Sequence, residues 1–91
     1  EVSKNGHNFT VSPHNWFWEM FPTWENGTFK VFDNYAINKN VLDIGAWIGC
    51  TTIYLSKIAK RVVSIEPNPL EYGRMISNIM LNKCGNVHTV N

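Results

Sequence analysis

The chain has no long apolar run, few cysteines and no excess of charge of one sign. A helix that crosses a membrane needs about 20 consecutive apolar residues, and no stretch of the sequence approaches that length. The amino end, residues 1–6, also lacks the apolar core of a secretory signal peptide. We therefore expect no membrane partner and a cytoplasmic location.

The two cysteines, Cys50 and Cys84, form no recognisable metal or disulfide pattern. They lie in different expected elements without Cys-x-x-Cys spacing, so a disulfide framework has little support. Cys84 and His88 are separated by three residues, but a tetrahedral site needs a second pair of ligands and none follows. We expect two reduced thiols and no metal ion.

The charges are almost balanced, because eight Lys and Arg stand against seven Asp and Glu, which gives a net charge of +1. Surfaces that bind nucleic acid are usually strongly basic, so we expect no nucleic-acid partner. With 44% hydrophobic and 16% charged residues, the composition is that of an ordinary globular protein. A length of 91 residues allows one domain or a part of one.

The amino-terminal part of the chain is rich in aromatic residues and has little periodicity. Residues 1–11 are polar and suggest a loose leader or an edge segment. Ser12-Pro13 is typical of a helix start, so we expect a short aromatic helix that ends at Pro22. A second helix, capped by Thr28, is expected to carry three apolar residues at helical spacing: Phe29, Phe32 and Ala36.

From residue 40 the pattern becomes that of a parallel α/β sheet. Val41–Ile44 is a short apolar run before a glycine-bearing turn, which is typical of a buried parallel strand. An amphipathic helix is expected over residues 51–60, and the β-branched run Arg61–Ile65 is expected to be the second strand. This order of strand, helix and strand predicts a Rossmann-like parallel sheet.

A further helix and a third strand extend this unit. Asn68 is placed to cap the helix, with Pro69 in its first turn and Glu71 at the position of a capping box. Its apolar face is expected to comprise Tyr72, Met75, Ile76, Ile79 and Met80. Gly85 is expected to cap the carboxyl end of the helix, and Val87–Val90 to open the third strand.

Two polar or glycine-bearing segments follow the first two strands at one edge of the expected sheet. Asp43, Gly45 and Gly49 follow or end the first strand, and Glu66 ends the second, 23 residues after Asp43. The carboxyl ends of neighbouring strands border the ligand crevice in a doubly wound sheet. Glycines let a backbone approach a ligand, and an acid at about this offset holds a ribose in dinucleotide folds. The pattern therefore predicts a ligand that contains a ribose.

The glycine spacing bears on which cofactor carries that ribose. A pyrophosphate-binding loop has the pattern Gly-x-Gly-x-x-Gly, whereas here three residues separate Gly45 from Gly49 and no third glycine follows. This weakens the case for an NAD(P)-binding oxidoreductase fragment, which stays open as an alternative. A non-catalytic nucleotide-binding remnant also stays open, because a fold does not fix a function.

These motifs resemble the FkbM-type branch of class I S-adenosylmethionine-dependent methyltransferases. The resemblance covers residues 24–91 and is carried by Val41–Gly49, Val63–Pro69, Asn78, Asn82, and Trp24-Glu25 with Thr28-Phe29, which resemble a "WE…TF" element. It implies an enzyme that uses S-adenosyl-L-methionine as cofactor and transfers its methyl group to oxygen. By position, it implies five cofactor-binding residues: Asp43, Gly45, Ala46, Gly49 and Glu66.

The resemblance also implies a role for each part of this site. Asp43 is expected to contact the methionine part through the loop or ordered water, Gly45–Gly49 to lie under the methionine and adenosine, and Glu66 to hold the ribose hydroxyls. The acceptor-side motifs of the family lie beyond Asn91, so the catalytic residues stay unknown. The methyl acceptor is expected to be a small molecule or a glycan.

The resemblance implies the amino-terminal βαβα part of a class I methyltransferase fold, preceded by one or two helices. We divide the chain into an amino-terminal helical and aromatic segment, residues 1–39, and a truncated cofactor-binding half, residues 40–91. A complete domain needs several more strands, so we expect a fragment that is inactive alone. We interpret the aromatic cluster of Trp16, Phe17 and Trp18 as packing on the sheet rather than as part of an acceptor pocket.

Overall fold

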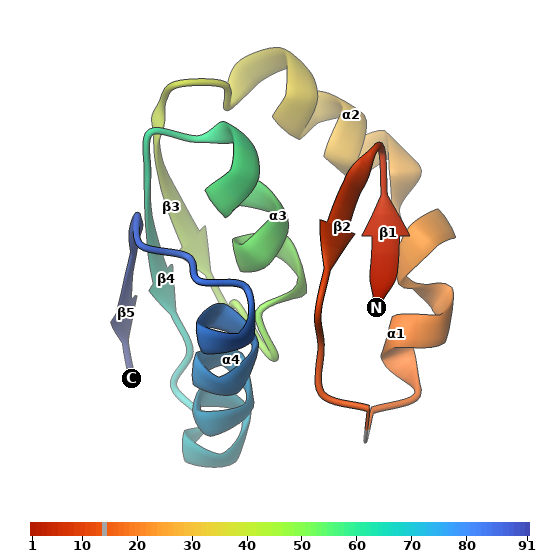
Figure 1. Cartoon of the computed structure of the whole chain (residues 1–91). Helices are drawn as coiled ribbons and strands as arrows, with labels where there is room; N and C mark the ends of the chain where they lie inside the picture. The colour runs from red at the N-terminus through yellow and green to blue at the C-terminus, as the bar shows by residue number, and fades with distance from the viewer. Residues whose placement is uncertain (14) are drawn as a thin grey trace.

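A computed structural model of the chain describes residues 1–13 and 15–91. It places a parallel sheet on one side, two helices against that sheet, and an amino-terminal hairpin with its own short helix beyond them (Figure 1). In chain order the elements are β1 (Val2–Lys4), β2 (His7–Phe9), α1 (Phe17–Met20), the 3₁₀ helix η1 (Phe21–Thr23), α2 (Asn26–Tyr35), β3 (Asn40–Ile44), α3 (Cys50–Ile58), β4 (Arg61–Ile65), α4 (Pro69–Leu81) and β5 (Val87–Val90).

The parallel sheet has the order β3-β4-β5, with β4 in the middle. Asn40 pairs with Arg61 and Ile44 with Ile65, while Val62 pairs with Val87 on the other side of β4. All pairs are parallel, and α3 and α4 supply the crossovers between successive strands. The expected Rossmann-like parallel sheet and its three strands are therefore confirmed.

Only one face of this sheet is covered in the described part of the chain. Val62 and Ser64 of β4 are fully buried on the face that α3 and α4 cover. On the opposite face, the exposed fractions are 57% for Leu42, 72% for Ile44 and 42% for Val90. The expectation that β3 is a buried strand is therefore wrong, because its side chains alternate between a covered and an open face.

Helix α4 begins as expected but differs from the prediction at three other points. The Asn68 side chain caps it by accepting hydrogen bonds from the backbone N–H groups of Leu70 and Glu71. The capping-box assignment of Glu71 is wrong, because Glu66 accepts the Asn68 N–H instead. The other two points concern the apolar face and the end of α4.

Met80, expected on the apolar face of α4, is 72% exposed, and the buried polar residue Asn78 lies on the packed side instead. Gly85 does not cap the helix, which ends at Leu81, and Lys83 takes the left-handed backbone conformation after it, with φ +52°. The burial of Asn78 follows from its contact with the amino-terminal segment, because its Oδ1 accepts a hydrogen bond from the Ser12 N–H.

Residues 2–9 form an antiparallel hairpin, so of the two expected alternatives the loose leader is wrong. Strands β1 and β2 pair from Val2 with Phe9 to Lys4 with His7. Asn5 and Gly6 form the turn with φ +50° and +85°, as two-residue hairpin turns require. Phe9 is completely buried, so the hairpin is part of the core.

Lys4 fastens this hairpin to the segment between α1 and α2. Its side chain is only 2% exposed, and its Nζ donates hydrogen bonds to the carbonyl oxygens of Phe21 at 3.0 Å and Trp24 at 2.8 Å, and to Asn26 Oδ1 at 3.0 Å. The ammonium also lies 4.5 Å from the centroid of the Phe29 ring. A buried cation is costly unless it is fully hydrogen-bonded, and these contacts meet that condition.

The aromatic helix starts later than expected and does not end at Pro22. Ser12 does not cap it: α1 begins at Phe17, whose N–H donates to Asn15 Oδ1 at 2.8 Å. Pro22 lies in the first turn of η1, where its missing N–H costs no hydrogen bond. His14 falls within the expected helix but lies outside the described residues.

The second helix also starts earlier, at Asn26, so Thr28 is not its cap. Glu25 precedes it with φ +46° and accepts a hydrogen bond from the Thr28 hydroxyl at 3.0 Å. Phe29 and Ala36 are buried as expected, and Phe32 is half-buried.

One aromatic cluster joins the amino-terminal segment to the sheet layer. Phe9, Phe17 and Phe29 pack with Tyr54 of α3 and Met75 of α4. Phe17 and Trp18 are core residues, 2% and 4% exposed, but they pack in this cluster and not on the sheet, so the expected packing on the sheet is wrong. Trp16 is 69% exposed. The boundary between residues 39 and 40 stays a prediction.

Candidate functional site

The loop between β3 and α3 folds back tightly over the carboxyl ends of two strands. The N–H groups of Gly45 and Ala46 both donate to the Ile65 carbonyl oxygen, at 2.8 and 3.0 Å. Gly45, Trp47 and Gly49 have φ of +76°, +56° and +91°. Since only glycine adopts such angles without strain, the two glycines allow the reversal of the chain.

The two glycines of the loop differ in what surrounds them. A Cβ built at Gly45 would meet no atom within 4 Å, so this side of the backbone is open. A Cβ at Gly49 would lie 3.1 Å from Met75 Cγ, so the close approach at this position is to α4. The open space at Gly45 leaves room for a ligand, and the lack of a side chain at Gly49 lets the loop pack on α4.

The Glu66 carboxylate joins the loop to the start of α4. Its Oε1 accepts a hydrogen bond from the Trp47 N–H at 2.7 Å, and its Oε2 accepts one from the Asn68 N–H at 3.0 Å. The residue is 8% exposed, so these charge-assisted bonds are largely shielded from water. Each carboxylate oxygen has more than one lone pair, so Glu66 keeps capacity for further donors.

Asp43 holds the first turn of α3. Its Oδ2 accepts hydrogen bonds from the hydroxyls of Thr51 at 2.6 Å and Thr52 at 2.8 Å. The Thr52 hydroxyl also lies 2.6 Å from Ser64 Oγ, and both of these residues are fully buried. A polar network therefore links β3, α3 and β4 beneath the loop.

We predicted from the sequence that the five candidate residues lie at one edge of the sheet, and in the structure they lie at that edge. Reasoning from the sequence missed Thr51, Thr52 and the Trp47 N–H as partners of the two carboxylates. The signal for the hydroxyls was present, because two threonines open the helix directly after the glycine loop. No local signal predicted the bond from Trp47 to Glu66, since 19 residues separate the two.

Cys50, the first residue of α3, is buried. Its thiol has a pKa of about 12 instead of the ordinary 9.0, mainly because burial disfavours the charged thiolate. The thiol is therefore neutral at physiological pH, and the thiolate is the reactive form of cysteine. Cys84 is also a free cysteine, as expected.

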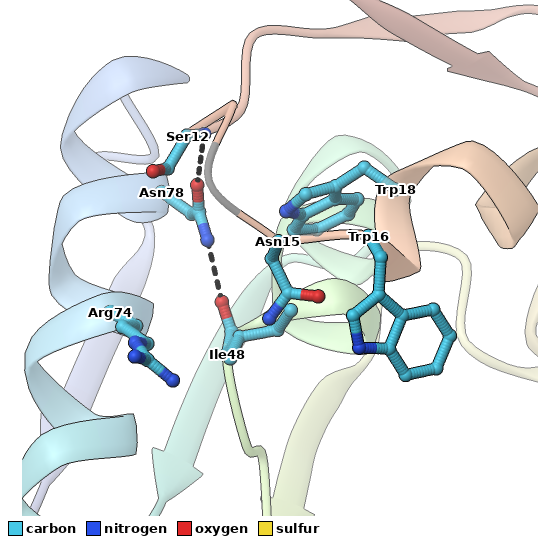
Figure 2. Close-up of a pocket in the computed structure, with 7 residues that line it drawn as sticks. All are labelled: Ser12, Asn15, Trp16, Trp18, Ile48, Arg74 and Asn78. Carbon is cyan, nitrogen blue, oxygen red and sulfur yellow. Dashed lines mark hydrogen bonds between the residues drawn. The ribbon is translucent and has the colours of Figure 1, made fainter.

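Two asparagines that contribute to the family resemblance fasten the amino-terminal segment: Asn78 of α4, and Asn82, which directly follows the last residue of α4. The Asn78 Nδ2 donates to the Ile48 carbonyl oxygen at 2.9 Å, and its Oδ1 accepts from the Ser12 N–H at 3.1 Å (Figure 2). The Asn82 side chain exchanges two hydrogen bonds with the backbone of Thr10, at 2.8 and 2.9 Å. Both asparagines therefore position the segment that runs past the loop.

Within residues 1–13 and 15–91, no group of three or more His, Cys, Asp or Glu side chains is arranged to hold a metal ion. In the same residues, no helix is both long and apolar enough to span a bilayer.

The sequence matches no family model and no curated protein, but solved structures match its fold. One is M. jannaschii TYW2 in complex with AdoMet, which is 29% identical with a TM-score of 0.62, over 97% of this chain and 40% of that one. Another is precorrin-6y C5,15-methyltransferase from Geobacter metallireducens, 18% identical with a TM-score of 0.66, over 99% and 47% of the two chains.

A third match is phosphoethanolamine N-methyltransferase 1 of Haemonchus contortus, in complex with phosphoethanolamine and S-adenosylhomocysteine. It is 26% identical with a TM-score of 0.58, over 66% of this chain and 13% of that one. The chain spans less than half the length of each of these three proteins. Its fold is the Rossmann-like α/β fold that these three proteins share; two of them are methyltransferases by name, and two contain AdoMet or S-adenosylhomocysteine.

Proposed function

We propose that this chain binds S-adenosyl-L-methionine and supplies the cofactor-binding part of a methyltransferase. The observation that carries the proposal is the pairing of an open glycine, Gly45, with a buried carboxylate, Glu66, at the carboxyl ends of two adjacent parallel strands. Ligands of open α/β sheets bind at this edge. Two of the similar structures, at 26% and 29% identity, contain S-adenosylhomocysteine or AdoMet.

The residues present fit such a cofactor. Glu66 has lone pairs left to accept bonds from ribose hydroxyls, and Gly45 offers exposed backbone with open space at its Cβ position. Ala46 is only 1% exposed, so it supports the loop from within the core. Asp43 acts on the cofactor through the loop, because its Oδ2 is bonded to hydroxyls of α3. Gly49 contributes its backbone conformation. When bound, the cofactor supplies an electrophilic methyl group, and the protein supplies orientation and proximity.

The molecule that accepts the methyl group is a separate part of the proposal. The FkbM-type resemblance favours transfer to an oxygen of a small molecule or glycan. The balanced charge favours no nucleic-acid partner, and the lack of a long apolar run or signal core favours a cytoplasmic location without a membrane partner. The phosphoethanolamine enzyme among the similar structures is an N-methyltransferase, so the fold alone does not select oxygen. Turnover is proposed for a protein longer than this chain, which covers at most 47% of the three similar structures.

Calorimetric titration of the chain with S-adenosyl-L-methionine and, separately, with NAD tests the proposal. We expect heat from S-adenosyl-L-methionine and none from NAD, because the loop has two glycines with three residues between them, whereas a pyrophosphate loop has three glycines. Binding of NAD alone would support the oxidoreductase alternative. Binding of neither ligand would support a non-catalytic remnant.

A further inference from the structure

A cavity of about 230 Å³ lies between α1, the β3–α3 loop and α4 (Figure 2). None of the five proposed cofactor residues lines it, and its walls are Ser12, Asn15, Trp16, Trp18, Ile48, Arg74 and Asn78. Complete small-molecule sites usually measure about 300–1,000 Å³. The cavity therefore has room for one chemical group of a ligand rather than for a whole cofactor.

The Trp18 indole supplies a buried donor to this cavity. Trp18 is 4% exposed, and its Nε1 has no hydrogen-bond partner among residues 1–13 and 15–91. Figure 2 shows the nitrogen-bearing edge of the ring turned toward Asn15 and the side where Ser12 and Asn78 lie. A buried N–H without an acceptor costs about 1–3 kcal/mol, so a ligand that offers an acceptor here gains from making that bond.

Two more donors border the same space. Arg74 extends from α4 toward the cavity (Figure 2). Among residues 1–13 and 15–91, only its Nη1 is paired, with Glu71 Oε1 at 3.2 Å. A guanidinium has five N–H donors, so others stay available. Asn15 uses its Oδ1 to accept the Phe17 N–H, which leaves its amide N–H groups to donate. The amide of Asn78 is already used at both of its polar atoms.

Arg74 is the one charged side chain among the described residues that line the cavity, and it is paired with the Glu71 carboxylate. No carboxylate lines this cavity within the described residues, whereas Glu1 and Glu19 line an adjoining hollow on the other side of Trp18 and Asn15. These carboxylates repel an anion from the adjoining hollow. The Trp16 ring, 69% exposed, offers a flat apolar surface beside the donors.

We propose that this cavity binds the oxyanion of a small molecule, a carboxylate or a phosphate carried on an aromatic or apolar body. The oxyanion accepts hydrogen bonds from Trp18 Nε1, Arg74 and Asn15, and the body lies against Trp16. Charge-assisted bonds to a guanidinium are stronger than neutral ones, so Arg74 contributes most of the selectivity for an anion. The proposal is independent of the cofactor, because the two sites share no proposed binding residue.

The indole N–H resonances of the four tryptophans give a direct test by NMR titration of the chain. The probes are benzoate, phenyl phosphate and the uncharged benzyl alcohol, and Trp18→Phe assigns the Trp18 signal. We expect benzoate, phenyl phosphate or both to shift that signal saturably, and benzyl alcohol to leave it in place. Benzoate alone identifies a carboxylate site, and phenyl phosphate alone identifies a phosphate site.

A charge-matched pair of variants completes the test. Arg74→Gln is expected to weaken binding of the charged probe about tenfold or more, because it removes a charge-assisted bond. Lys30→Gln removes one positive charge from an exposed position of α2 and is expected to leave binding unchanged. The proposal is overturned if neither charged probe shifts the Trp18 signal, if benzyl alcohol shifts it equally, or if Arg74→Gln binds like the unmodified chain.

Discussion

The backbone N–H of Trp47 donates a hydrogen bond of 2.7 Å to Glu66 Oε1, so the acid that ends β4 holds the loop that follows β3. This contact gives Glu66 a structural role in addition to the proposed bonds to a ribose. The carboxylate is fixed before any ligand arrives, because its second oxygen is bonded to the Asn68 N–H. A binding group that is already positioned loses less conformational entropy on binding.

Replacing Glu66 by alanine should therefore destabilise the chain as well as impair binding. The change removes two hydrogen bonds to a buried carboxylate, and we expect a loss of about 2–4 kcal/mol in the free energy of unfolding. Urea denaturation measures it, with Glu19→Ala, at an exposed position of α1, as the control. Equal stability of the two variants would show that Glu66 does not hold the loop.

Lys4 offers a test of the amino-terminal hairpin. Lys4→Met keeps the side-chain length but leaves the carbonyl oxygens of Phe21 and Trp24 without their donor, so we expect a loss of about 2–4 kcal/mol. Lys30→Met, at an exposed position of α2, should change stability by less than about 0.5 kcal/mol. Thermal or urea unfolding compares the two. A Lys4→Met chain as stable as the control would mean that the hairpin is not anchored by this ammonium.

The prediction that the hairpin is a loose leader failed for an identifiable reason. The acceptors that satisfy Lys4 are 17 to 22 residues away, so no local pattern reveals that a lysine is buried there. A local signal for the turn did exist, because Asn5-Gly6 is the dipeptide most typical of a two-residue hairpin. The strands were short, and their alternation of apolar and polar residues is weak.

The sheet and its helices were predicted because their signals are local. The β-branched run Arg61–Ile65 and the cap formed by Asn68 and Pro69 each act within a few residues of chain. The exposed side chains of Leu42 and Ile44 could not be predicted in this way. An apolar strand gives no indication of which of its faces another element covers.

The buried thiol of Cys50 gives a prediction for alkaline pH. Its pKa is raised to about 12 in the folded chain, so above pH 9 the unfolded chain releases a proton that the folded chain retains. The Cys50 thiol therefore makes its full contribution to the free energy of unfolding below pH 9, and this contribution is lost as the pH rises toward 12.

We expect the unmodified chain to lose about 2 kcal/mol more stability than Cys50→Ala between pH 8 and pH 11. Urea unfolding at both pH values measures this difference, and use of the variant removes the contribution of other titrating groups. Parallel losses in the two proteins would contradict a raised thiol pKa.

Gly49 should be the less replaceable of the two loop glycines. An alanine there combines a left-handed φ of +91° with a Cβ 3.1 Å from Met75 Cγ, whereas at Gly45 the Cβ meets nothing within 4 Å. We expect Gly49→Ala to cost at least about 1 kcal/mol more than Gly45→Ala. Denaturation of both variants tests the difference, and the reverse order would mean that α4 does not constrain the loop.

The most direct measurement is the affinity of S-adenosyl-L-methionine for Gly45→Ala compared with Gly6→Ala. Both glycines have a left-handed φ and open space at the Cβ position, so the two substitutions carry a similar backbone strain. Only Gly45 lies in the proposed site, so its added methyl group should weaken binding about tenfold or more while Gly6→Ala binds like the unmodified chain. Equal affinity of the two variants would contradict a cofactor site at this edge of the sheet.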